Sequence, residues 1–377
     1  MKVLIVSSHL THPTDAGNRA AIMAQVNILK SLGHDVHLLF IDMSLRNTDY
    51  SEMQQYWGDR YHVFHQPTLC KAYRLCIDFY RKHTGGYWKW DDHYAGFGLA
   101  AYVNRLQEEQ HFDAVIVQYM RLAKLLPQIT IPRKAIYTHD VFAYKDLRTG
   151  GPFYETCTAH QEAKAMQCCP TIFAIQESEA AYYSILSPKS VVRTVYCPYD
   201  FHEQPIVPDC QNLLYMASSM EFNVNGIQWF IDNVWPSVSA TNPKARLLIA
   251  GAVSTKINTH GATGIETQGF VREVANFYQR ANIVINPVYQ GTGLKIKTFE
   301  ALSYGKTTIV HPHSTTGIYE RSSAPLIVAQ DATEWIQKLN DALRTDFPHE
   351  QKREEDRRYI LSMKQHIEQQ FEAFLHS

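Results

Sequence analysis

The amino-terminal segment carries the pattern that most constrains the fold. Residues 3–6 (VLIV) are a continuous apolar run, which is typical of a strand buried on both faces of a parallel sheet. A polar loop follows, then apolar residues at helical spacing that end at Gly33, and a second apolar run covers residues 36–41. A strand, a helix and a strand in this order predict a right-handed crossover, and therefore a parallel α/β sheet.

The same alternation continues along the chain. Further strands are predicted at residues 114–118, 134–137, 171–175, 213–217, 246–250, 283–286 and 308–310. Helices are predicted at residues 225–233, 272–281 and 297–304. We therefore expect an α/β fold made of two Rossmann-like, doubly wound parallel-sheet domains. Such sheets bind ligands beyond the carboxyl ends of their strands, so the loops at residues 7–19 and 288–297 are the places to look for chemistry.

The length of 377 residues fits two domains of ordinary size. The boundary is expected near Cys197 and Pro198, where an apolar run ends in a polar stretch that contains proline. This predicts an amino-terminal domain over residues 1–197, a second domain over residues 198–350 and a charged helical tail over residues 351–377.

Charge and cysteine usage restrict the partners. Lys and Arg number 36 against 37 Asp and Glu, so no overall field draws the chain onto nucleic acid, and we expect no nucleic-acid partner. The 7 cysteines are scattered without a C-x-x-C pair, which favours neither a disulfide framework nor a zinc site. No stretch approaches the about 18 apolar residues of a membrane span. We expect a cytoplasmic protein, at most peripherally bound to a membrane.

The segment PVYQGTGLKIKTFEALSYGK carries the strongest chemical signal. Gly291 and Gly293 allow a tight turn that directs backbone N–H groups at an oxyanion, and the helix that follows adds its positive end. Lys295 and Lys297 supply formal charge, which suits a phosphate or diphosphate. Glu300 would repel phosphate and accept hydrogen bonds from sugar hydroxyls instead, so the set predicts a nucleotide. The alternative is a glycine loop with two solvated lysines and a surface carboxylate.

Residues 269–310 closely resemble the carboxy-terminal signature of glycosyltransferase family 4, a large group of retaining GT-B enzymes (glycosyl transferases group 1). A Gly-Phe-Val strand end, a short helix, a strand ending in Pro, a Gly-rich loop, a Glu-Ala helix and a Gly-Lys turn follow in that family's order. Residues 213–251 and the amino-terminal segment resemble the family's other segments. The resemblance implies a GT-B fold, with two Rossmann-like domains facing a cleft and a last helix that crosses back to the first domain.

The resemblance also implies a donor site in the second domain. Glu300 would bind the ribose of a nucleotide-diphosphate sugar. The backbone amides of Thr292, Gly293 and Leu294 would hold the diphosphate. The base would lie against the strand end formed by Phe270 and Val271.

In the first domain the resemblance implies contacts with the donor phosphates, the transferred sugar and the acceptor. Gly17 would let the first β-α loop approach them. From the residues of that loop alone, one of Asp15, Asn18 and Arg19 is a candidate contact with the acceptor, and ordinary polarity of an exposed loop is the alternative. His139 would lie beside the transferred sugar, donating a hydrogen bond to a hydroxyl, while Asp140 fixes the nearby geometry. The alternative is a structural histidine.

The sequence departs from the family pattern at two places. The first Glu of the family's Glu-x7-Glu motif falls at Thr292 or Gln290, neither of which is acidic. Ser219 and its neighbours stand where the family usually has Arg and Lys. Lys295 and Lys297 are therefore expected to neutralise the leaving diphosphate. The candidate catalytic residues are His139, Lys295, Lys297 and Glu300, and the candidate substrate-binding residues are Gly17, Asn18, Asp140, Ser219, Phe270, Val271, Gln290, Thr292, Gly293 and Leu294.

The function implied is retaining transfer of a sugar from a nucleotide-diphosphate donor to a glycan or lipid-linked acceptor, in bacterial surface polysaccharide, lipopolysaccharide or other glycoconjugate synthesis. The departing phosphate would help to deprotonate the acceptor, and no metal or other cofactor is expected. A nucleotide-sugar 2-epimerase of the same fold and a non-catalytic relative that binds a nucleotide or glycan are the alternatives.

Residues 71–90 mix basic and aromatic side chains. This composition suits peripheral contact with the inner membrane, where rings lie at headgroup depth and cations meet anionic lipid. A stacking platform for sugars, or for nucleic acid, would have a similar composition. The remaining alternative is an ordinary amphipathic helix whose aromatic side chains face the core.

Overall fold

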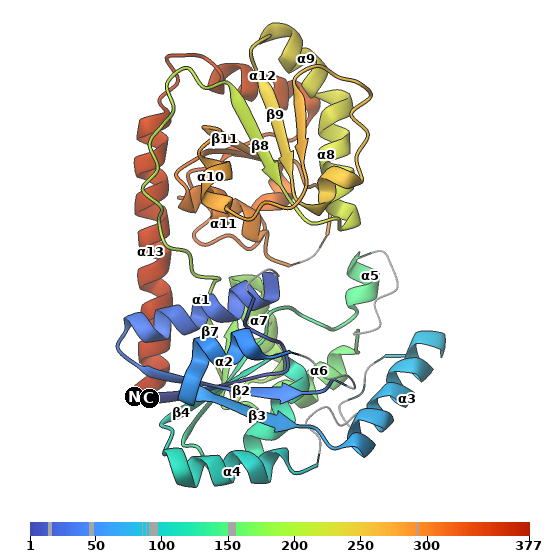
Figure 1. Ribbon diagram of the computed structural model, residues 1–377, viewed down its shortest axis with the longest axis vertical. Coiled ribbons are helices and arrows are strands. Elements are labelled where there is room, and N and C mark those ends of the chain that lie inside the picture. The colour runs from blue at the N-terminus through green and yellow to red at the C-terminus, as the bar shows by residue number, and fades with distance from the viewer. Residues whose placement is uncertain are drawn as a thin grey trace. The chain divides into compact units, whose positions relative to one another are not determined.

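The computed structural model describes residues 1–13, 17–44, 49–84, 86–87, 89, 97–149, 156–291 and 293–377. The chain forms two compact units (Figure 1). The first unit comprises Met1–Pro198 with Gln365–Ser377, and the second comprises Tyr199–Lys364. The final helix, α13 (His349–Leu375), therefore begins in the second unit and ends in the first.

The described residues of the first unit form a seven-stranded sheet in the order β3-β2-β1-β4-β5-β6-β7. Its strands are β1 (Lys2–Ser7), β2 (Asp35–Asp42), β3 (Tyr61–His65), β4 (Ala114–Gln118), β5 (Arg133–Tyr137), β6 (Thr171–Ala174) and β7 (Val191–Thr194). Every pair of neighbours is parallel. The strand order reverses between β1 and β4, which makes this the switch point where doubly wound sheets bind ligands.

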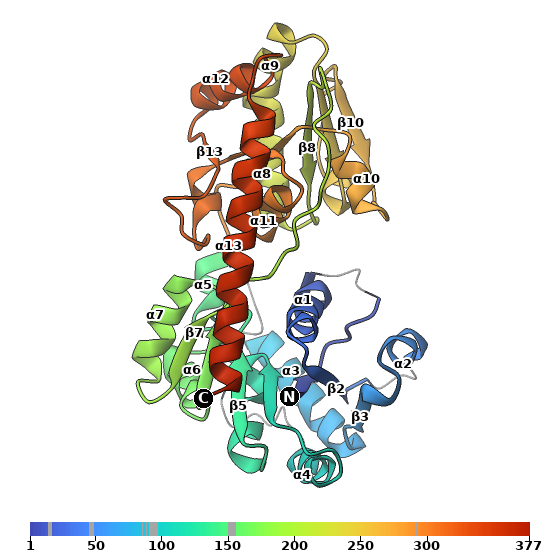
Figure 2. The same cartoon turned by 90° about the vertical axis from the view of Figure 1, so that its left-hand side faces the viewer.

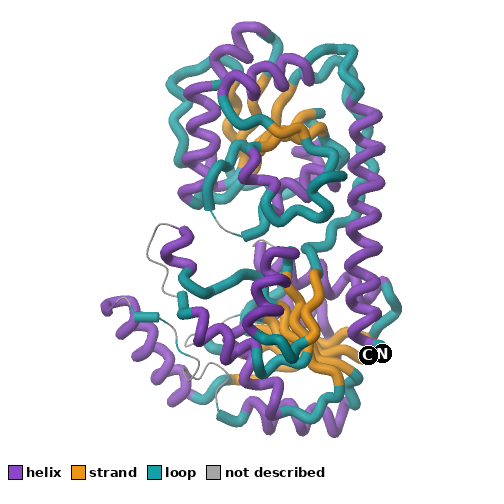
Figure 3. The backbone as a smooth tube through the Cα atoms, turned by 180° about the vertical axis from the view of Figure 1, so that it is seen from behind, coloured by secondary structure: helices purple, strands orange, loops and turns teal. Residues whose placement is uncertain are grey.

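Helices surround this sheet (Figure 3). They are α1 (Gly17–Ser31), α2 (Ser51–Trp57), α3 (Thr68–Thr84), α4 (Leu99–Gln110), α5 (Lys145–Thr149), α6 (Ala159–Met166) and α7 (Glu177–Leu186), with 3-10 turns η1 (Gly58–Arg60) and η2 (Met120–Gln128). All five residues of β4 are buried, as expected for a central strand covered on both faces.

The second unit contains a parallel six-stranded sheet in the order β10-β9-β8-β11-β12-β13, which reverses between β8 and β11. Its strands are β8 (Asn212–Met216), β9 (Arg246–Ala250), β10 (Ile265–Gln268), β11 (Ile283–Asn286), β12 (Thr307–Val310) and β13 (Ile327–Val328). Its helices are α8 (Glu221–Asn233), α9 (Trp235–Thr241), α10 (Val274–Tyr278), α11 (Ile296–Ser303) and α12 (Ala332–Ala342), with 3-10 turns η3 (Ala252–Thr255) and η4 (Pro312–Thr315). Trp235 and Trp335 are fully buried in its core.

The end of α13 packs on the sheet of the first unit (Figure 2). The rings of Phe371 and Phe374 contact the ring of Phe173 in β6, with centroids 5.2 and 5.3 Å away. Arg193 in β7 also donates a hydrogen bond to Gln370 at 3.4 Å. The charged tail thus supplies part of the core of the first unit, because its apolar residues face the sheet.

The predicted fold class, two doubly wound parallel sheets, is confirmed. One predicted helix is shorter than expected, since residues 272–281 contain only the helix Val274–Tyr278. Among the described helices, none combines the length and apolar character that crossing a membrane requires.

Candidate functional site

The switch point of the second unit brings two loops to the same edge of the sheet. One loop follows β8 and contains Ser219, which is exposed. The other follows β11, contains the Gly-rich turn and leads directly into α11. The amino end of α11, with its positive helix dipole, therefore lies at the edge where an anionic ligand is expected. The N–H groups of Ile296 and Thr298 donate to the backbone carbonyls of Leu294 and Lys295 at 3.0 and 2.9 Å.

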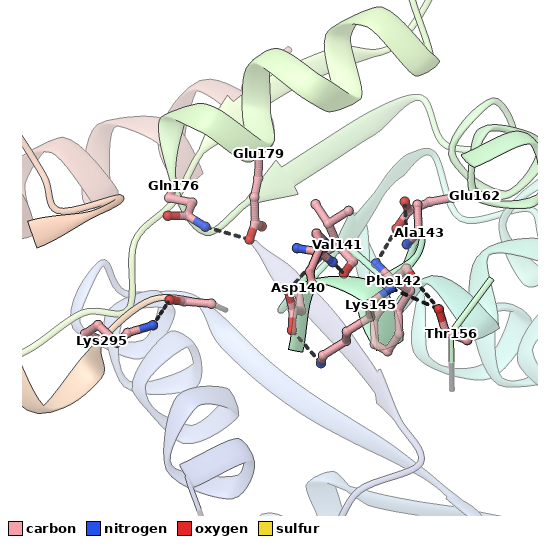
Figure 4. A network of polar contacts seen from close by, with 12 residues as sticks. Asp140, Val141, Phe142, Ala143, Lys145, Thr156, Glu162, Gln176, Glu179 and Lys295 are labelled. Carbon is pink, nitrogen blue, oxygen red and sulfur yellow. Dashed lines mark hydrogen bonds and ion pairs between the residues drawn. The ribbon is translucent and has the colours of Figure 1, made fainter. Parts of the chain in front are cut away.

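The Gly-rich turn is held by two side chains that bind its carbonyl groups. The ammonium of Lys295 is buried and donates hydrogen bonds to the carbonyls of Gly291 and Gly293 at 3.4 and 3.2 Å (Figure 4). Nε2 of His313, just beyond β12, lies 2.9 Å from the carbonyl oxygen of Gly291. Gly291 has a φ of 99°, a conformation that other residues rarely adopt. Lys295 thus shapes the turn in addition to bringing a positive charge to it.

Lys297 lies on the first turn of α11 and is partly buried. Its ammonium donates a hydrogen bond to Oδ1 of Asn223. Asn223 is buried in α8 and donates in turn to the backbone carbonyl and hydroxyl of Ser218, at 3.2 and 3.1 Å. Burial, reinforced by the charge of Lys295, lowers the pKa of Lys297 to about 7. An anion beside this ammonium would favour its charged form and raise the pKa again.

Glu300 lies one turn further along α11. Tyr278 Oη donates a hydrogen bond to Glu300 Oε2 at 3.2 Å, and the Tyr278 ring stacks on that of Tyr304. Burial raises the pKa of Glu300, while the Tyr278 hydrogen bond and the Lys297 charge act in the opposite direction. The other oxygen, Oε1, has no hydrogen-bond partner among the described residues, so it can accept one from a ligand hydroxyl.

The remaining donor-site candidates lie around this edge in different environments. Phe270 is 75% exposed just beyond β10, whereas Val271 packs against the apolar core. Gln290 is exposed, and Gly293 and Leu294 are half-buried. Thr292 lies outside the described residues.

Sequence reasoning missed three residues that hold the predicted ones. Asn223 and Tyr278 lie inside helices, where nothing in the local pattern distinguishes them from packing residues. His313 follows a predicted strand, and that position could have indicated it.

The first unit has its own polar cluster at the switch point between β1 and β4. His139 follows β5, and its Nε2 lies 2.6 Å from Oε1 of Gln118, the last residue of β4. The ring of Tyr119 stacks on His139 with centroids 4.2 Å apart. Burial, together with the nearby His9, lowers the pKa of His139 to about 3, so the imidazole is neutral at physiological pH.

The other candidates of the first unit have partners of their own. Oδ2 of Asp140 forms an ion pair with Lys145 at 2.5 Å, and its Oδ1 accepts the N–H of Val141 at 2.8 Å (Figure 4). The Asn18 amide lies 3.2 Å from Nδ1 of His9. Gly17 is exposed at the start of α1. His139 and Asn18 thus come from different elements to the same end of the sheet.

Among the residues that the structure describes, no group of three or more His, Cys, Asp or Glu side chains is arranged to hold a metal ion. The polar groups gathered at the second-unit edge are instead two ammonium groups, the amino end of α11 and one carboxylate.

Comparison with known proteins identifies the type of domain. Residues 211–345, all in the second unit, match the family model described as Glycosyl transferases group 1, which confirms the predicted resemblance. A protein from the cps region of Klebsiella pneumoniae, described as an uncharacterized 44.6 kDa protein, is 22% identical over 356 residues, or 88% of each chain.

Solved structures with this fold include TarM of S. aureus, with a TM-score of 0.69 and 9% identity, covering 100% of this chain and 99% of TarM. HepE of Anabaena in complex with UDP and glucose gives a TM-score of 0.62 at 11% identity, covering 99% of this chain and 100% of HepE. The fold is therefore that of GT-B glycosyltransferases, as predicted.

Proposed function

We propose that this protein is a retaining glycosyltransferase of family 4 that moves a sugar from a nucleoside-diphosphate donor to a glycan or lipid-linked acceptor. The observation that carries the proposal is the joint placement of Lys297, Glu300 and the start of α11 at the second-unit switch point. This site lies inside the segment that matches the Glycosyl transferases group 1 model. The relative from a cps region supports a role in bacterial surface polysaccharide or lipopolysaccharide synthesis.

The proposed reaction breaks the bond between the anomeric carbon and the diphosphate oxygen and forms one to an acceptor oxygen. The electron pair of the broken bond stays on the diphosphate, whose oxygen takes up the acceptor proton. The site must therefore stabilise negative charge that grows on the leaving group. The Lys297 ammonium and the positive end of the α11 dipole are suited to this.

Each remaining group of the site has a role in this proposal. Glu300 Oε1 accepts hydrogen bonds from the ribose hydroxyls, while Tyr278 orients the carboxylate. Lys295 keeps the Gly-rich turn in the shape that the diphosphate needs. Because the two lysines and the positive end of α11 can supply the stabilising charge, we propose that the reaction uses no metal cofactor. The presence of UDP with both HepE and TarM supports a UDP-sugar donor.

Helix α3 supports peripheral contact with the inner membrane. Leu69, Phe79 and Tyr80 are 85%, 66% and 67% exposed. The basic residues Lys71 and Arg74 lie on the other side and donate to backbone carbonyls of the first unit at 2.5 and 2.9 Å. The alternative in which the aromatic residues face the core is therefore wrong for this helix. Trp88 and Trp90, in the same predicted segment, lie outside the described residues.

We propose that insertion of the apolar side chains of α3 into the lipid layer contributes most to membrane binding. An outward apolar face with aromatic rings suits the boundary between headgroups and acyl chains. Figure 1 shows α3 at the margin of the first unit. We propose that this face brings the enzyme to a lipid-linked acceptor.

The function is tested by incubating the protein with nucleotide sugars, first without an acceptor. A glycosyltransferase is expected to hydrolyse its donor slowly, a 2-epimerase to change its sugar, and a binding protein to leave it unchanged. Addition of glycan or lipid-linked acceptors should then accelerate release of the nucleoside diphosphate. NMR of the product should show that the anomeric configuration is retained.

A further inference from the structure

The amide side chain of Asn223 joins Lys297 to the loop after β8. Asn223 lies in the first turn of α8 and is buried. Its Oδ1 accepts a hydrogen bond from the Lys297 ammonium. Its Nδ2 donates to the backbone carbonyl and to the hydroxyl of Ser218, at 3.2 and 3.1 Å. Ser218 is exposed just beyond β8, and the proposed transfer mechanism gives neither Asn223 nor Ser218 a role.

The partners of Asn223 fix which end of the amide faces which group. A carbonyl oxygen can only accept a hydrogen bond, so the amide nitrogen must face the Ser218 carbonyl, whether or not Lys297 is charged. A charged ammonium can only donate, so the amide oxygen must face Lys297. Turning the amide over would place its oxygen against the Ser218 carbonyl oxygen and its nitrogen against the ammonium. Both contacts therefore require the same orientation.

This orientation makes the Ser218 hydroxyl a hydrogen-bond donor for a ligand. An amide nitrogen carries two hydrogens, one for each oxygen of Ser218, so the hydroxyl oxygen accepts from Asn223. The hydrogen of that hydroxyl has no acceptor among the described residues, so it can bind a phosphate oxygen. It belongs to the loop where the family usually has Arg and Lys.

The partner of Lys297 is neutral and leaves its charge uncompensated. Asn223 accepts one of the three N–H groups of the ammonium, and within the described part of the chain the other two have no hydrogen-bond acceptor. The charges near this ammonium are those of Lys295 and Glu300, and the Tyr215 ring lies 5.6 Å away. A buried ammonium with two unsatisfied N–H groups is suited to an anionic ligand.

We propose that Asn223 is a positioning residue that aligns the Lys297 ammonium and the Ser218 hydroxyl as two hydrogen-bond donors to the phosphate oxygens of the nucleotide sugar. The amide oxygen holds the first and the amide nitrogen orients the second, so one side chain of α8 connects α11 to the loop after β8. The identity of the ligand rests on the proposed glycosyltransferase function, whereas the contact between Asn223 and Lys297 does not.

The contact with Lys297 is tested without any ligand. NMR of protein labelled with 13C-lysine follows the titration of Lys297, whose pKa is about 7, and Lys297→Met identifies its signal. Asn223→Asp places a carboxylate against the ammonium and should raise this pKa by about one unit or more. The matched control is Asn282→Asp, at a buried asparagine of the second unit that bonds to the backbone of Val207, and it should leave the pKa unchanged. An unchanged Lys297 pKa in Asn223→Asp would contradict the positioning role.

UDP and GDP are the probes for the hydroxyl. Titration calorimetry should show that Ser218→Ala weakens binding of the nucleoside diphosphate by about tenfold, because a hydrogen bond to a charged group is lost. Ser218 is exposed, so this variant leaves the core intact. Ser237→Ala is the matched control, because Ser237 is exposed in α9, beyond the far end of α8. Full affinity in Ser218→Ala would overturn the proposal.

The pH dependence of binding separates positioning from general damage. Affinity of the wild-type protein should fall above pH 7, because the free lysine loses its proton there and the ligand must restore it. In Asn223→Asp the carboxylate competes with the diphosphate for Lys297, so binding at pH 7 should be about 10- to 100-fold weaker and should stay level to higher pH. Weaker binding that still falls above pH 7 would indicate damage and contradict the proposal.

Failure of the inference and failure of the proposed function give different results. If the wild-type protein binds a nucleoside diphosphate and Ser218→Ala and Asn223→Asp bind it equally well, the inference is wrong and the proposed function stands. If the wild-type protein binds neither UDP nor GDP, the glycosyltransferase assignment is contradicted, and the Lys297 titration in Asn223→Asp still decides whether Asn223 positions the lysine.

Discussion

Tyr278 donates a hydrogen bond to Glu300 and so orients its carboxylate. Among the described residues of the proposed donor site, Glu300 is the only one with a carboxylate. Tyr278 Oη lies 3.2 Å from Glu300 Oε2. The tyrosine is itself fixed by stacking on Tyr304 with centroids 4.2 Å apart. The bond uses one carboxylate oxygen and leaves the other for a ligand, so a helix residue and a neighbouring aromatic residue together set the direction of the acceptor.

Replacement of Glu300 by alanine should weaken binding of the nucleoside diphosphate. Hydrogen bonds to a charged group contribute about 1.5–3 kcal/mol, which corresponds to an affinity loss of roughly 10- to 100-fold. Titration calorimetry measures this loss directly. Tyr278→Phe is the matched control, since it keeps the carboxylate and should cost less. Full affinity in Glu300→Ala would contradict the ribose role.

Binding of a nucleoside diphosphate should be accompanied by proton uptake near neutral pH. The pKa of Lys297 is about 7 in the free protein, and a nearby diphosphate would raise it, so that at pH 7.5 a largely neutral amine becomes charged. Calorimetry in buffers of different ionisation enthalpy counts the protons. Lys297→Met should abolish the uptake, whereas Lys256→Met, at an exposed position, should not. Uptake that persists in Lys297→Met would assign the proton to another group.

The same lysine predicts how the stability of the nucleotide-free protein depends on pH. The unfolded chain keeps the Lys297 proton up to its usual pKa of 10.5, while the folded protein loses it near 7. Between these values the unfolded state binds more protons, so the contribution of this group to stability rises with pH and is lowest below pH 7. Lys297→Met should therefore raise the melting temperature most at pH 6 and less at pH 9. An equal gain at both values would mean that the lysine is not desolvated.

The outward face of α3 should control binding to lipid vesicles. Phe79→Glu or Leu69→Glu removes an exposed apolar side chain and places a charge there. Loss of one buried side chain of this size weakens partitioning by about tenfold or more. Vesicle sedimentation measures the effect, and Ile185→Glu is the control because Ile185 is 80% exposed in α7 of the same unit. Equal binding by all three variants would place the membrane contact elsewhere.

Gly251 should not tolerate a side chain. It follows β9 with a φ of 85°, and an added Cβ would lie 2.3 Å from the carbonyl oxygen of Ala217. Gly251→Ala should lower the free energy of unfolding of the second unit by about 1–3 kcal/mol, which chemical denaturation can measure. Gly269→Ala, whose Cβ would meet nothing within 4 Å, should be close to neutral. Similar stability of the two variants would contradict the close approach at Gly251.

The sequence predicted the central strands because burial on both faces leaves a continuous apolar run, as in β1 and β4. The apolar pattern did not reveal edge strand β10, because three of its four residues are exposed, and only the family resemblance implied a strand ending near Phe270. The lysines of the Gly-rich segment could be predicted as a charged pair. Their separate contacts, Lys295 with the carbonyls of its own turn and Lys297 with Asn223, depend on loop geometry and on a distant helix that local spacing does not encode.

The most direct test of the donor site is a thermal-shift screen of the wild-type and Glu300→Ala proteins with UDP, GDP, ADP, CMP and dTDP. A ligand that binds only the folded state raises the melting temperature. We expect a clear shift with a nucleoside diphosphate, UDP being the first candidate, and a much smaller shift in Glu300→Ala. If no nucleotide raised the melting temperature of the wild-type protein, the proposed nucleotide-sugar site at the second-unit switch point would be contradicted.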